Sequence, residues 1–368
     1  MKKSRPTPKP AQVAERKPEP PGFVTHECEA DVSEGLENIA WRELKTLFED
    51  RIESSPLPKR PGVLRFQYMG NLWQLLRLKT VQAVYLIEQY DIPRPKGLLG
   101  DQHFKRLLAQ IARVRDLSPA DAYNSFYLSA AGSDSAVMTR IKDELAAKLG
   151  LTPGGEEGDL LVRLRRVPQS ETGWEALVRL SPRPLATRAW RVCNREGALN
   201  AAVAQAMVML TQPTPDDTFL NIMCGSGTLL IERAAQGAAA SLIGYDHDTA
   251  ALDCARRNVE AAGYAEQIKL RQSDARDLTL ADKSVDVIVG DLPFGNLVGS
   301  HEGNLELYPA VLREMARVAR PGARVALISQ EVRLLESLLD ESKVWEKAQV
   351  IRVALGGLHP RIFLLKRN

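Results

Sequence analysis

The sequence predicts an α/β protein. Its C-terminal half should be Rossmann-like, with a mostly parallel sheet that ends in an antiparallel hairpin, and two α+β domains should precede it. Three observations predict this class. Runs of β-branched and apolar residues alternate with predicted helices through the C-terminal half, as in a doubly wound sheet. Small or acidic residues follow four of these runs, at the edge where such sheets bind ligands. The last two runs are joined by a short glycine-containing turn, which is typical of a hairpin.

The C-terminal domain is placed at residues 186–368, and a helix at 197–210 leads into it. Its predicted strands are 218–223, 241–245, 267–271, 285–291, 324–329, 349–355 and 361–366. Two further helices are predicted at 229–236 and 305–320, and the proline-glycine pair at 321–322 should end the second one.

The front of the chain predicts a tail and two smaller units. Residues 1–21 contain six prolines and almost nothing to bury, so we expect a disordered tail. Residues 22–100 begin with a strand and a helix at 35–48, whose apolar residues recur at helical spacing. Residues 101–185 form a second α+β unit. Its predicted helices are 101–115 and 135–149, and its strands are 125–130, 159–166 and 175–181.

Composition limits the possible environments. No apolar run reaches the ~18 residues of a membrane span, and no apolar leader follows the N-terminus, so we expect a cytoplasmic protein without a membrane segment. We also expect it to act as a monomer. The cysteines have no Cys-x-x-Cys spacing, which favours reduced thiols over disulfides or a zinc site. The histidines form no ligand pair, so no metal site is expected. The four cysteines are Cys28, Cys193, Cys224 and Cys254.

A small-residue turn follows the first strand of the C-terminal domain and predicts a ligand loop. Gly225 and Gly227 let backbone approach a ligand closely, but Leu230 stands where a dinucleotide fingerprint has its third glycine. A pyrophosphate is therefore a poor candidate. Asp246, roughly 20 residues on, is placed to accept from ribose hydroxyls, and Asp274 from an adenine amino group.

These features describe a nucleoside without phosphates, and we interpret it as S-adenosylmethionine. Either acidic residue alone could be a simple turn cap; their order after successive strands favours the cofactor. The predicted cofactor-binding residues are Met223, Cys224, Gly225, Ser226, Gly227, Thr228, Asp246, His247, Asp274, Ala275 and Asp291.

The predicted catalytic turn is Asp291, Leu292, Pro293 and Phe294, which ends a β-branched run. The carboxylate of Asp291 and the carbonyl of Leu292 are two acceptors for an exocyclic amino group. Pro293 stiffens the turn, and Phe294 offers a face on which a heterocycle can stack. This combination predicts methylation of an amino group on a flat ring, although the turn could also be an ordinary strand ending.

An arginine-rich stretch precedes the catalytic domain. Between residues 163 and 195 there are eight arginines and only two acidic residues, in a chain of net charge +3. Arginine pairs well with phosphate, so an RNA-backbone surface is predicted, the alternative being a solvated strand face and linker. The predicted RNA contacts are Arg163, Arg165, Arg166, Arg183, Arg188 and Arg191.

The loop at 221–232, the turn at 291–295 and the segment 304–318 together resemble the THUMP-domain guanine-N2 methyltransferases, in particular the branch that acts on the sixth nucleotide of tRNA. The resemblance extends from about residue 22 to the C-terminus. It implies a ferredoxin-like domain at 22–100, a THUMP domain at 101–185 and a class I methyltransferase domain at 186–368. It also implies tRNA as the substrate. Asn296 departs from the family, which usually has Lys or Arg there, and this affects a substrate contact rather than the chemistry.

Several alternatives share part of this pattern. DNA adenine-N6 and protein-glutamine methyltransferases use a similar catalytic turn, which more often begins with Asn. A guanine-N2 methyltransferase acting on ribosomal RNA or at another tRNA position has the same motifs. A non-enzymatic RNA-binding protein is disfavoured by the presence of all expected site residues, and a nucleotide-dependent oxidoreductase by the missing third glycine.

Overall fold

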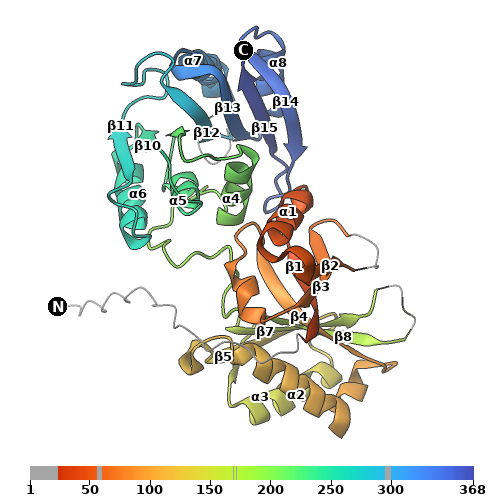
Figure 1. Ribbon diagram of the computed structural model, residues 1–368. Coiled ribbons are helices and arrows are strands. Elements are labelled where there is room, and N and C mark those ends of the chain that lie inside the picture. The colour runs from red at the N-terminus through yellow and green to blue at the C-terminus, as the bar shows by residue number, and fades with distance from the viewer. Residues whose placement is uncertain (1–23, 56–59, 169, 171, 295–299) are drawn as a thin grey trace, which may run out of the picture.

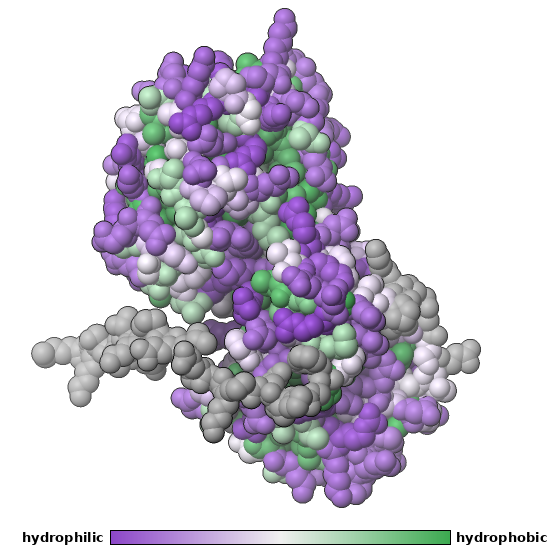
Figure 2. Space-filling view, viewed as in Figure 1, coloured by the Kyte–Doolittle hydropathy of each residue, from purple (hydrophilic) through white to green (hydrophobic). Residues whose placement is uncertain are grey.

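The computed structural model describes residues 24–55, 60–168, 170, 172–294 and 300–368. Two sheets, one in each half of the chain, organise the molecule (Figure 1). The predicted tail at 1–21 and Asn296 lie outside the described residues. In the part of the chain that is described, no helix combines the length and the apolar character needed to cross a membrane. On the face shown in Figure 2, hydrophilic residues cover much of both halves, and hydrophobic residues are scattered among them.

The N-terminal half contains one eight-stranded sheet, in the order β2-β3-β1-β4-β8-β7-β5-β6. Strand β4 pairs antiparallel with β8, which joins the strands of the two predicted N-terminal domains edge to edge. The side chain of Gln110, from α2, donates to the carbonyls of Leu86 and Ala176 at 2.9 and 3.0 Å and so ties that helix to the joined strands. The division near residue 100 therefore separates chain segments within a shared sheet, and the domain assignments remain predictions.

The elements of this half alternate short strands with helices. Its strands are β1 (Thr25–Asp31), β2 (Ile52–Ser54), β3 (Val63–Met69), β4 (Ala83–Tyr90), β5 (Ser125–Ala130), β6 (Thr152–Pro153), β7 (Leu160–Arg166) and β8 (Trp174–Arg179). Its α-helices are α1 (Glu37–Phe48), α2 (Asp101–Arg115) and α3 (Ala136–Leu149). Short 3-10 helices lie at Glu49–Arg51, Leu72–Arg77, Pro95–Leu99 and Ala120–Ala122.

The C-terminal half is a seven-stranded sheet in the order β11-β10-β9-β12-β13-β15-β14. The first five strands are parallel, and β15 is antiparallel to both β13 and β14. The predicted Rossmann-like sheet with a terminal hairpin is confirmed. The strands are β9 (Thr218–Ile222), β10 (Ser241–Asp246), β11 (Ile268–Gln272), β12 (Val285–Asp291), β13 (Ala319–Ser329), β14 (Trp345–Arg352) and β15 (Arg361–Arg367). The helices are α4 (Ala201–Leu210), α5 (Thr228–Ala234), α6 (Thr249–Ala261), α7 (His301–Val318) and α8 (Val332–Asp340).

Alternating side chains of the central strands enter two separate cores. Phe219 packs with residues of α4, α5 and α6, whereas its neighbour Leu220 packs with α7 and α8. Helices therefore cover both faces, as strands with continuous apolar sequence require. Chain order reverses between β9 and β12, so the carboxyl ends of these two strands mark the switch point where such folds bind ligands.

The end of α7 differs from the prediction. The helix stops at Val318, and Pro321 and Gly322 lie inside β13, whose register against β12 shifts near its start. A residue that precedes proline is disfavoured in helical conformation. Arg320 is therefore extended, and the strand begins before the proline rather than after it.

Direct contacts join the two halves. The Arg42 guanidinium donates to the Met209 carbonyl at 3.2 Å, and the Ala354 amide donates to the Glu34 carbonyl at 3.1 Å. Gly35 lies so close to the β14–β15 connection that a Cβ atom there would be 1.9 Å from the Arg352 carbonyl oxygen. The relative position of the halves is thus set by packed backbone as well as by the connecting chain.

Candidate active site

The loop between β9 and α5 has an unusual backbone. Met223, Gly225 and Gly227 have φ angles of 49°, 53° and 81°, in the left-handed region that favours glycine. The Cys224 amide donates to the Tyr245 carbonyl at 2.8 Å, and the Gly227 amide donates to the Cys224 carbonyl at 2.8 Å. A Cβ atom at Gly225 would meet no atom within 4 Å. The loop therefore presents open space beside Gly225, where a ligand can approach the backbone.

Asp246, the last residue of β10, supports this loop. Its carboxylate accepts from the Gly225 amide at 2.8 Å and from the Asp248 amide at 3.0 Å, one bond to each oxygen. Asp246 is 7% exposed, whereas the side chain of the adjacent His247 is 80% exposed. Each carboxylate oxygen can accept a second bond, so Asp246 can hold the loop and still receive ribose hydroxyls.

Asp274 lies beyond the end of β11 and is bound by a neighbouring arginine. The Arg276 guanidinium donates to both carboxylate oxygens, at 2.9 and 2.7 Å, and these bonds hold the pKa of Asp274 below its usual range. Ala275, next to it, is buried in the core that also contains Tyr245. An adenine amino group at this position would share the Asp274 carboxylate with Arg276.

Asp291 ends β12 at the same edge of the sheet. Gly290 pairs with Ile222 across the two strands, so Asp291 lies beside the start of the glycine loop. Burial raises the pKa of its carboxyl to about 7. Leu292 is buried, and its amide donates to the Ile328 carbonyl at 3.0 Å. Phe294 is half-buried and packs against the hydrophobic core, which leaves only part of its ring for stacking.

Two buried side chains of α7 hold the catalytic turn from behind. Asn304 donates to the Pro293 carbonyl at 3.0 Å, and the Tyr308 hydroxyl donates to the same oxygen at 2.8 Å. The Tyr308 hydroxyl is also 2.8 Å from the Ser329 hydroxyl. The sequence reasoning used this segment only as part of a family resemblance. The i,i+4 spacing of Asn304 and Tyr308 was the signal that both side chains face one way.

The arginines of β7 do not form the open surface that was predicted. Arg165 forms ion pairs with Glu29 at 2.5 Å and Glu175 at 2.7 Å, both fully buried carboxylates. Arg163 pairs with Asp31 at 3.2 Å and stacks over a tyrosine ring. The acidic partners come mostly from β1, more than 130 residues earlier, so a local charge count could not include them. Arg166 points to the other face, where it is exposed and stacks over Trp174.

The arginines after β8 also differ from the prediction. Arg188 forms an ion pair with Glu232 at 2.8 Å and donates to the Lys79 carbonyl at 2.6 Å, so it joins the two halves of the protein. Arg191 donates to the Leu199 carbonyl and the Thr228 hydroxyl, at 2.9 and 3.0 Å. Both guanidinium groups are therefore engaged inside the molecule. Arg183 is exposed.

The cysteines correct another expectation. Cys193 and Cys254 form a disulfide with an S–S distance of 2.14 Å, where the sequence had suggested four reduced thiols. The two residues are 61 positions apart, and only the fold brings their Cα atoms to 5.4 Å. Cys28 and Cys224 are free and buried, and burial raises the pKa of both thiols.

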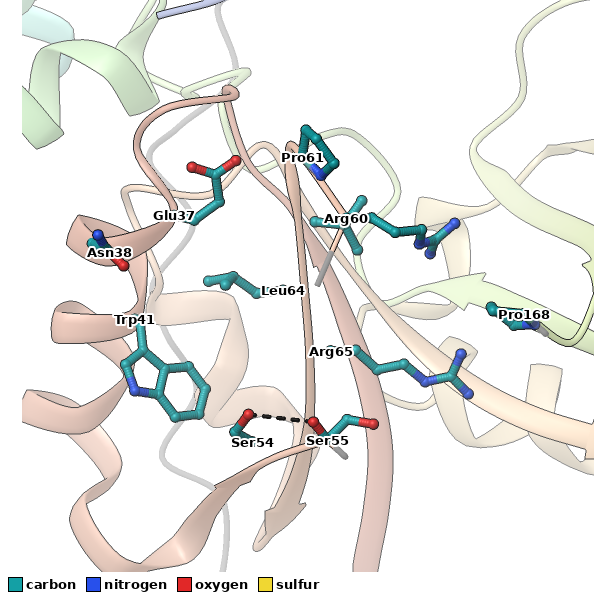
Figure 3. Close-up of a pocket in the computed structure, with 11 residues that line it drawn as sticks. Glu37, Asn38, Trp41, Ser54, Ser55, Arg60, Pro61, Leu64, Arg65 and Pro168 are labelled. Atoms are coloured by element: carbon teal, nitrogen blue, oxygen red, sulfur yellow. Dashed lines mark hydrogen bonds between the residues drawn. The ribbon is translucent and has the colours of Figure 1, made fainter. Parts of the chain in front are cut away.

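A pocket of about 570 Å³ lies in the N-terminal half, between α1, β2 and β3 (Figure 3). Its charged side chains already have partners. Glu37 accepts from the Gly35 and Gly62 amides, Arg60 pairs with Glu29, and Arg65 pairs with two carboxylates. The pocket contains none of the predicted site residues, and its charged groups do not require a ligand.

Comparison with known families identifies the half of the protein that carries the glycine loop and the catalytic turn. Residues 188–361 match the family described as RMKL-like, methyltransferase domain (UPF0020). This part of the chain is thus similar in sequence to a methyltransferase domain. Its sheet places the predicted cofactor loop, Asp246 and Asp291 at one edge, as described above.

Relatives extend the similarity beyond the methyltransferase domain. The chain is 37% identical over 183 residues to the mouse tRNA (guanine(6)-N(2))-methyltransferase THUMP3, a match that covers 46% of this chain and 36% of that protein. The chain thus spans about a third of the length of its mammalian relatives. It is 28% identical to the Thermus thermophilus tRNA (guanine(6)-N2)-methyltransferase, over 92% of this chain and 99% of that protein. These matches confirm the relationship that the motifs indicated.

Solved structures agree on the fold. TrmN from Thermus thermophilus superposes with a TM-score of 0.71 at 24% identity and covers 94% of this chain and 100% of its own. SMU.472, a methyltransferase candidate crystallised with SAH, has a TM-score of 0.64 at 14% identity, over 92% of this chain and 97% of that one. At these identities the likeness establishes the arrangement of both halves, not the substrate.

Proposed function

We propose that the protein transfers a methyl group from S-adenosylmethionine to the exocyclic N2 of a guanine in tRNA. The observation that carries the proposal is the catalytic turn. A carboxyl with a raised pKa and a rigidly held proline carbonyl end the strand beside the glycine loop of a methyltransferase domain. The relatives named as tRNA (guanine(6)-N2)-methyltransferases support guanine N2 in tRNA over adenine N6 in DNA, and the sixth nucleotide as the position.

The residues of the cofactor site fit S-adenosylmethionine. The open space at Gly225 accommodates a group that a side chain would exclude, and Asp246 keeps accepting capacity for ribose hydroxyls. Asp274 is the acceptor proposed for the adenine amino group. When bound, S-adenosylmethionine supplies an electrophilic methyl group. The predicted set is Met223, Cys224, Gly225, Ser226, Gly227, Thr228, Asp246, His247, Asp274, Ala275 and Asp291.

The catalytic turn aligns the amine. Taking the guanine out of its stem costs a few kcal/mol, and the ring then stacks against the exposed part of Phe294. Its N2 amino group donates to the Asp291 carboxylate and the Leu292 carbonyl, which directs the nitrogen lone pair toward the methyl group. Such alignment can contribute ~7–11 kcal/mol. A carboxyl with a pKa of about 7 is suited to accept the amine proton after attack and release it to water near neutral pH.

RNA is held, in this proposal, by the N-terminal half, with its ferredoxin-like domain at 22–100 and THUMP domain at 101–185. Of the six arginines predicted to contact RNA, Arg166 and Arg183 are the exposed ones. Phosphate contacts of this kind position a substrate, whereas the pocket selects the base. We further propose that the protein acts as a monomer in the cytoplasm, where tRNA is available.

Mass spectrometry of nucleosides tests this function. Transfer RNA is incubated with the protein and S-adenosylmethionine carrying an isotopically labelled methyl group, and the digested RNA should contain labelled N2-methylguanosine. Asp291→Ala should abolish most of the label but leave cofactor affinity nearly intact, because the other residues of the predicted cofactor set remain and the catalytic contact of Asp291 is made to the reacting amine. Label found in N6-methyladenosine, or in no guanosine of the tRNA, would contradict the proposal.

A further inference from the structure

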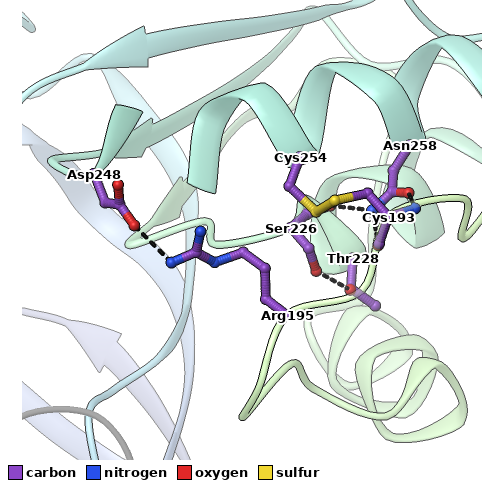
Figure 4. Close-up of a disulfide and its surroundings, with 7 residues drawn as sticks. All are labelled: Cys193, Arg195, Ser226, Thr228, Asp248, Cys254 and Asn258. Atoms are coloured by element: carbon purple, nitrogen blue, oxygen red, sulfur yellow. Dashed lines mark hydrogen bonds and ion pairs between the residues drawn. A yellow bond between two sulfur atoms is a disulfide. The ribbon is translucent and has the colours of Figure 1, made fainter. Parts of the chain in front are cut away.

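The chain between β8 and α4, residues 181–200, contacts the start of α5 and the helix α6, next to the glycine loop; we call it the crossing segment. Figure 4 shows two of its residues, Cys193 and Arg195, facing residues of α6 and of the glycine loop. We propose that Cys193 and Cys254 form a reversible thiol modification site, which reacts with small-molecule disulfides and thereby controls cofactor affinity. The expected effect on S-adenosylmethionine affinity rests on the proposed function.

One fully buried side chain connects the disulfide to the glycine loop. Asn258 accepts from the Cys193 amide at 2.9 Å and donates to the Cys193 carbonyl at 2.9 Å. The same amide nitrogen of Asn258 donates to the Ser226 carbonyl at 3.0 Å. Any displacement of Cys193 therefore acts on the asparagine that holds the loop.

The residues two positions before and after Cys193 make equivalent connections. Arg191 donates to the Thr228 hydroxyl at 3.0 Å, at the start of α5. Arg195 pairs with Asp248 at 2.6 Å, and the Asp248 amide in turn donates to Asp246. The disulfide thus lies at the centre of a short segment that is connected to the glycine loop through Asn258 and to the proposed ribose acceptor through Asp248.

The exchange chemistry follows from the different exposure of the two cysteine residues. Cys193 is half-buried and Cys254 is 3% exposed, so an external thiolate attacks the Cys193 sulfur. The S–S bond breaks, the Cys254 thiolate leaves and takes a proton, and Cys193 is left in a mixed disulfide with the external thiol. A second external thiolate attacks the external sulfur of that mixed disulfide, so a small-molecule disulfide forms and Cys193 leaves as a thiolate that takes a proton. In the reverse direction, the Cys193 thiolate attacks oxidised glutathione and expels one glutathione thiolate. The Cys254 thiolate then displaces the other, so two electrons pass from the protein to glutathione.

Oxidation should strengthen cofactor binding. A covalent bond between the crossing segment and α6 restricts the motion of the glycine loop before the ligand binds. Binding then costs less conformational entropy, and such preorganisation increases affinity. We expect the oxidised protein to bind S-adenosylmethionine roughly threefold to tenfold more tightly than the reduced protein, on this preorganisation argument. Cys28 and Cys224 should not respond, because both thiols are buried.

Calorimetry on the full chain tests the proposal. The wild-type protein is prepared with oxidised glutathione or with dithiothreitol, the Cys193–Cys254 linkage is verified by peptide mass mapping, and S-adenosylmethionine is titrated into each form. Amide hydrogen exchange of residues 191–200 and 223–228 is measured without cofactor. Oxidation should raise affinity and slow exchange in both segments. Cys193→Ser, which leaves only the buried Cys254 of this pair, should match the reduced protein under both conditions, and Cys28→Ala should keep the response.

The possible failures are distinct. Equal affinity and equal exchange in the two forms would overturn the proposal, as would failure of oxidised glutathione to form the linkage. If neither form bound S-adenosylmethionine while exchange still differed, the proposed function would fail and the thiol site would stand. The comparison of wild-type forms does not depend on the folding of any variant.

Discussion

Asp291 is the residue whose environment most affects the expected chemistry. It ends a buried strand, and desolvation raises its pKa to about 7 from an ordinary value of 3.8. Sequence alone predicted the carboxylate and its place at the end of a strand. It could not predict the raised pKa, because that depends on which side chains the fold packs around the carboxyl.

The raised pKa of Asp291 predicts a pH dependence with a definite sign. The folded state binds the Asp291 proton more tightly than the unfolded state, so this residue costs stability as pH rises from about 4 to 7, and the cost is constant above that range. Asp291→Asn removes it. The free energy of unfolding of the variant minus that of wild type should therefore increase by about 1–3 kcal/mol from pH 4 to pH 8. Denaturant unfolding at both pH values measures this, and a difference independent of pH would contradict it.

Among the elements, α7 provides the clearest example of a function that sequence left undetected. Strand ends, the glycine loop and the hairpin follow from local patterns, so they were predictable. The contact from α7 to the Pro293 carbonyl connects segments 15 residues apart through a buried tyrosine, and only the fold shows it. The β7 arginines are the converse case. Their alternation in the strand was predictable, but their acidic partners lie in a strand far away in the sequence.

Tyr308→Phe should slow the reaction without affecting cofactor binding. The substitution removes one of two donors to the Pro293 carbonyl and the contact with Ser329, at a cost to stability of about 1 kcal/mol. The turn then loses part of its alignment, so we expect kcat to fall about tenfold, which corresponds to ~1.4 kcal/mol of barrier. Single-turnover kinetics and calorimetry measure the two effects. A fall in cofactor affinity equal to the fall in rate would show a general loss of structure instead.

The arginines should separate into two classes. Replacing Arg166 and Arg183 together with Gln should reduce the slope of log affinity for tRNA against log salt by about 2, since each lost phosphate contact lowers it by roughly 0.9. Replacing Arg165 with Gln should leave that slope unchanged and destabilise the fold by about 1–3 kcal/mol, because Glu29 and Glu175 each lose one of two arginine partners. Filter binding over a salt series and denaturant unfolding distinguish them. An unchanged slope in the double variant would show that Arg166 and Arg183 do not contact tRNA phosphates.

At the scale of the whole molecule, the proposed function depends on the contact between the two halves. The sequence predicted the parts and their order, but not the edge-to-edge joining of the N-terminal strands or the close approach at Gly35. Local periodicity contains no information about which backbones meet. The close approach of Gly35 to Arg352 sets the position of RNA bound to the N-terminal half relative to the proposed catalytic pocket in the C-terminal half.

Gly35→Ala tests this coupling. A Cβ atom there would lie 1.9 Å from the Arg352 carbonyl oxygen, and the φ of +96° is itself unfavourable for alanine. The halves must shift, so methylation of tRNA should fall about tenfold or more, which corresponds to at least ~1.4 kcal/mol. Affinity for S-adenosylmethionine should stay within twofold, roughly 0.4 kcal/mol. Gly132→Ala, a positive-φ glycine with no atom within 4 Å of its Cβ position, controls for backbone strain alone. Equal losses in both variants would remove the coupling argument.

The most direct test of the central claim uses a tRNA in which inosine replaces guanosine at the sixth nucleotide. Inosine keeps the ring and its other polar edges but lacks the N2 amino group that the Asp291 turn is proposed to align. Under single-turnover conditions with labelled S-adenosylmethionine, the guanosine tRNA should be methylated and the inosine tRNA should remain unlabelled, although the two bind equally within a few fold. Methylation of the inosine tRNA at a comparable rate would contradict the assignment of guanine N2 as the acceptor.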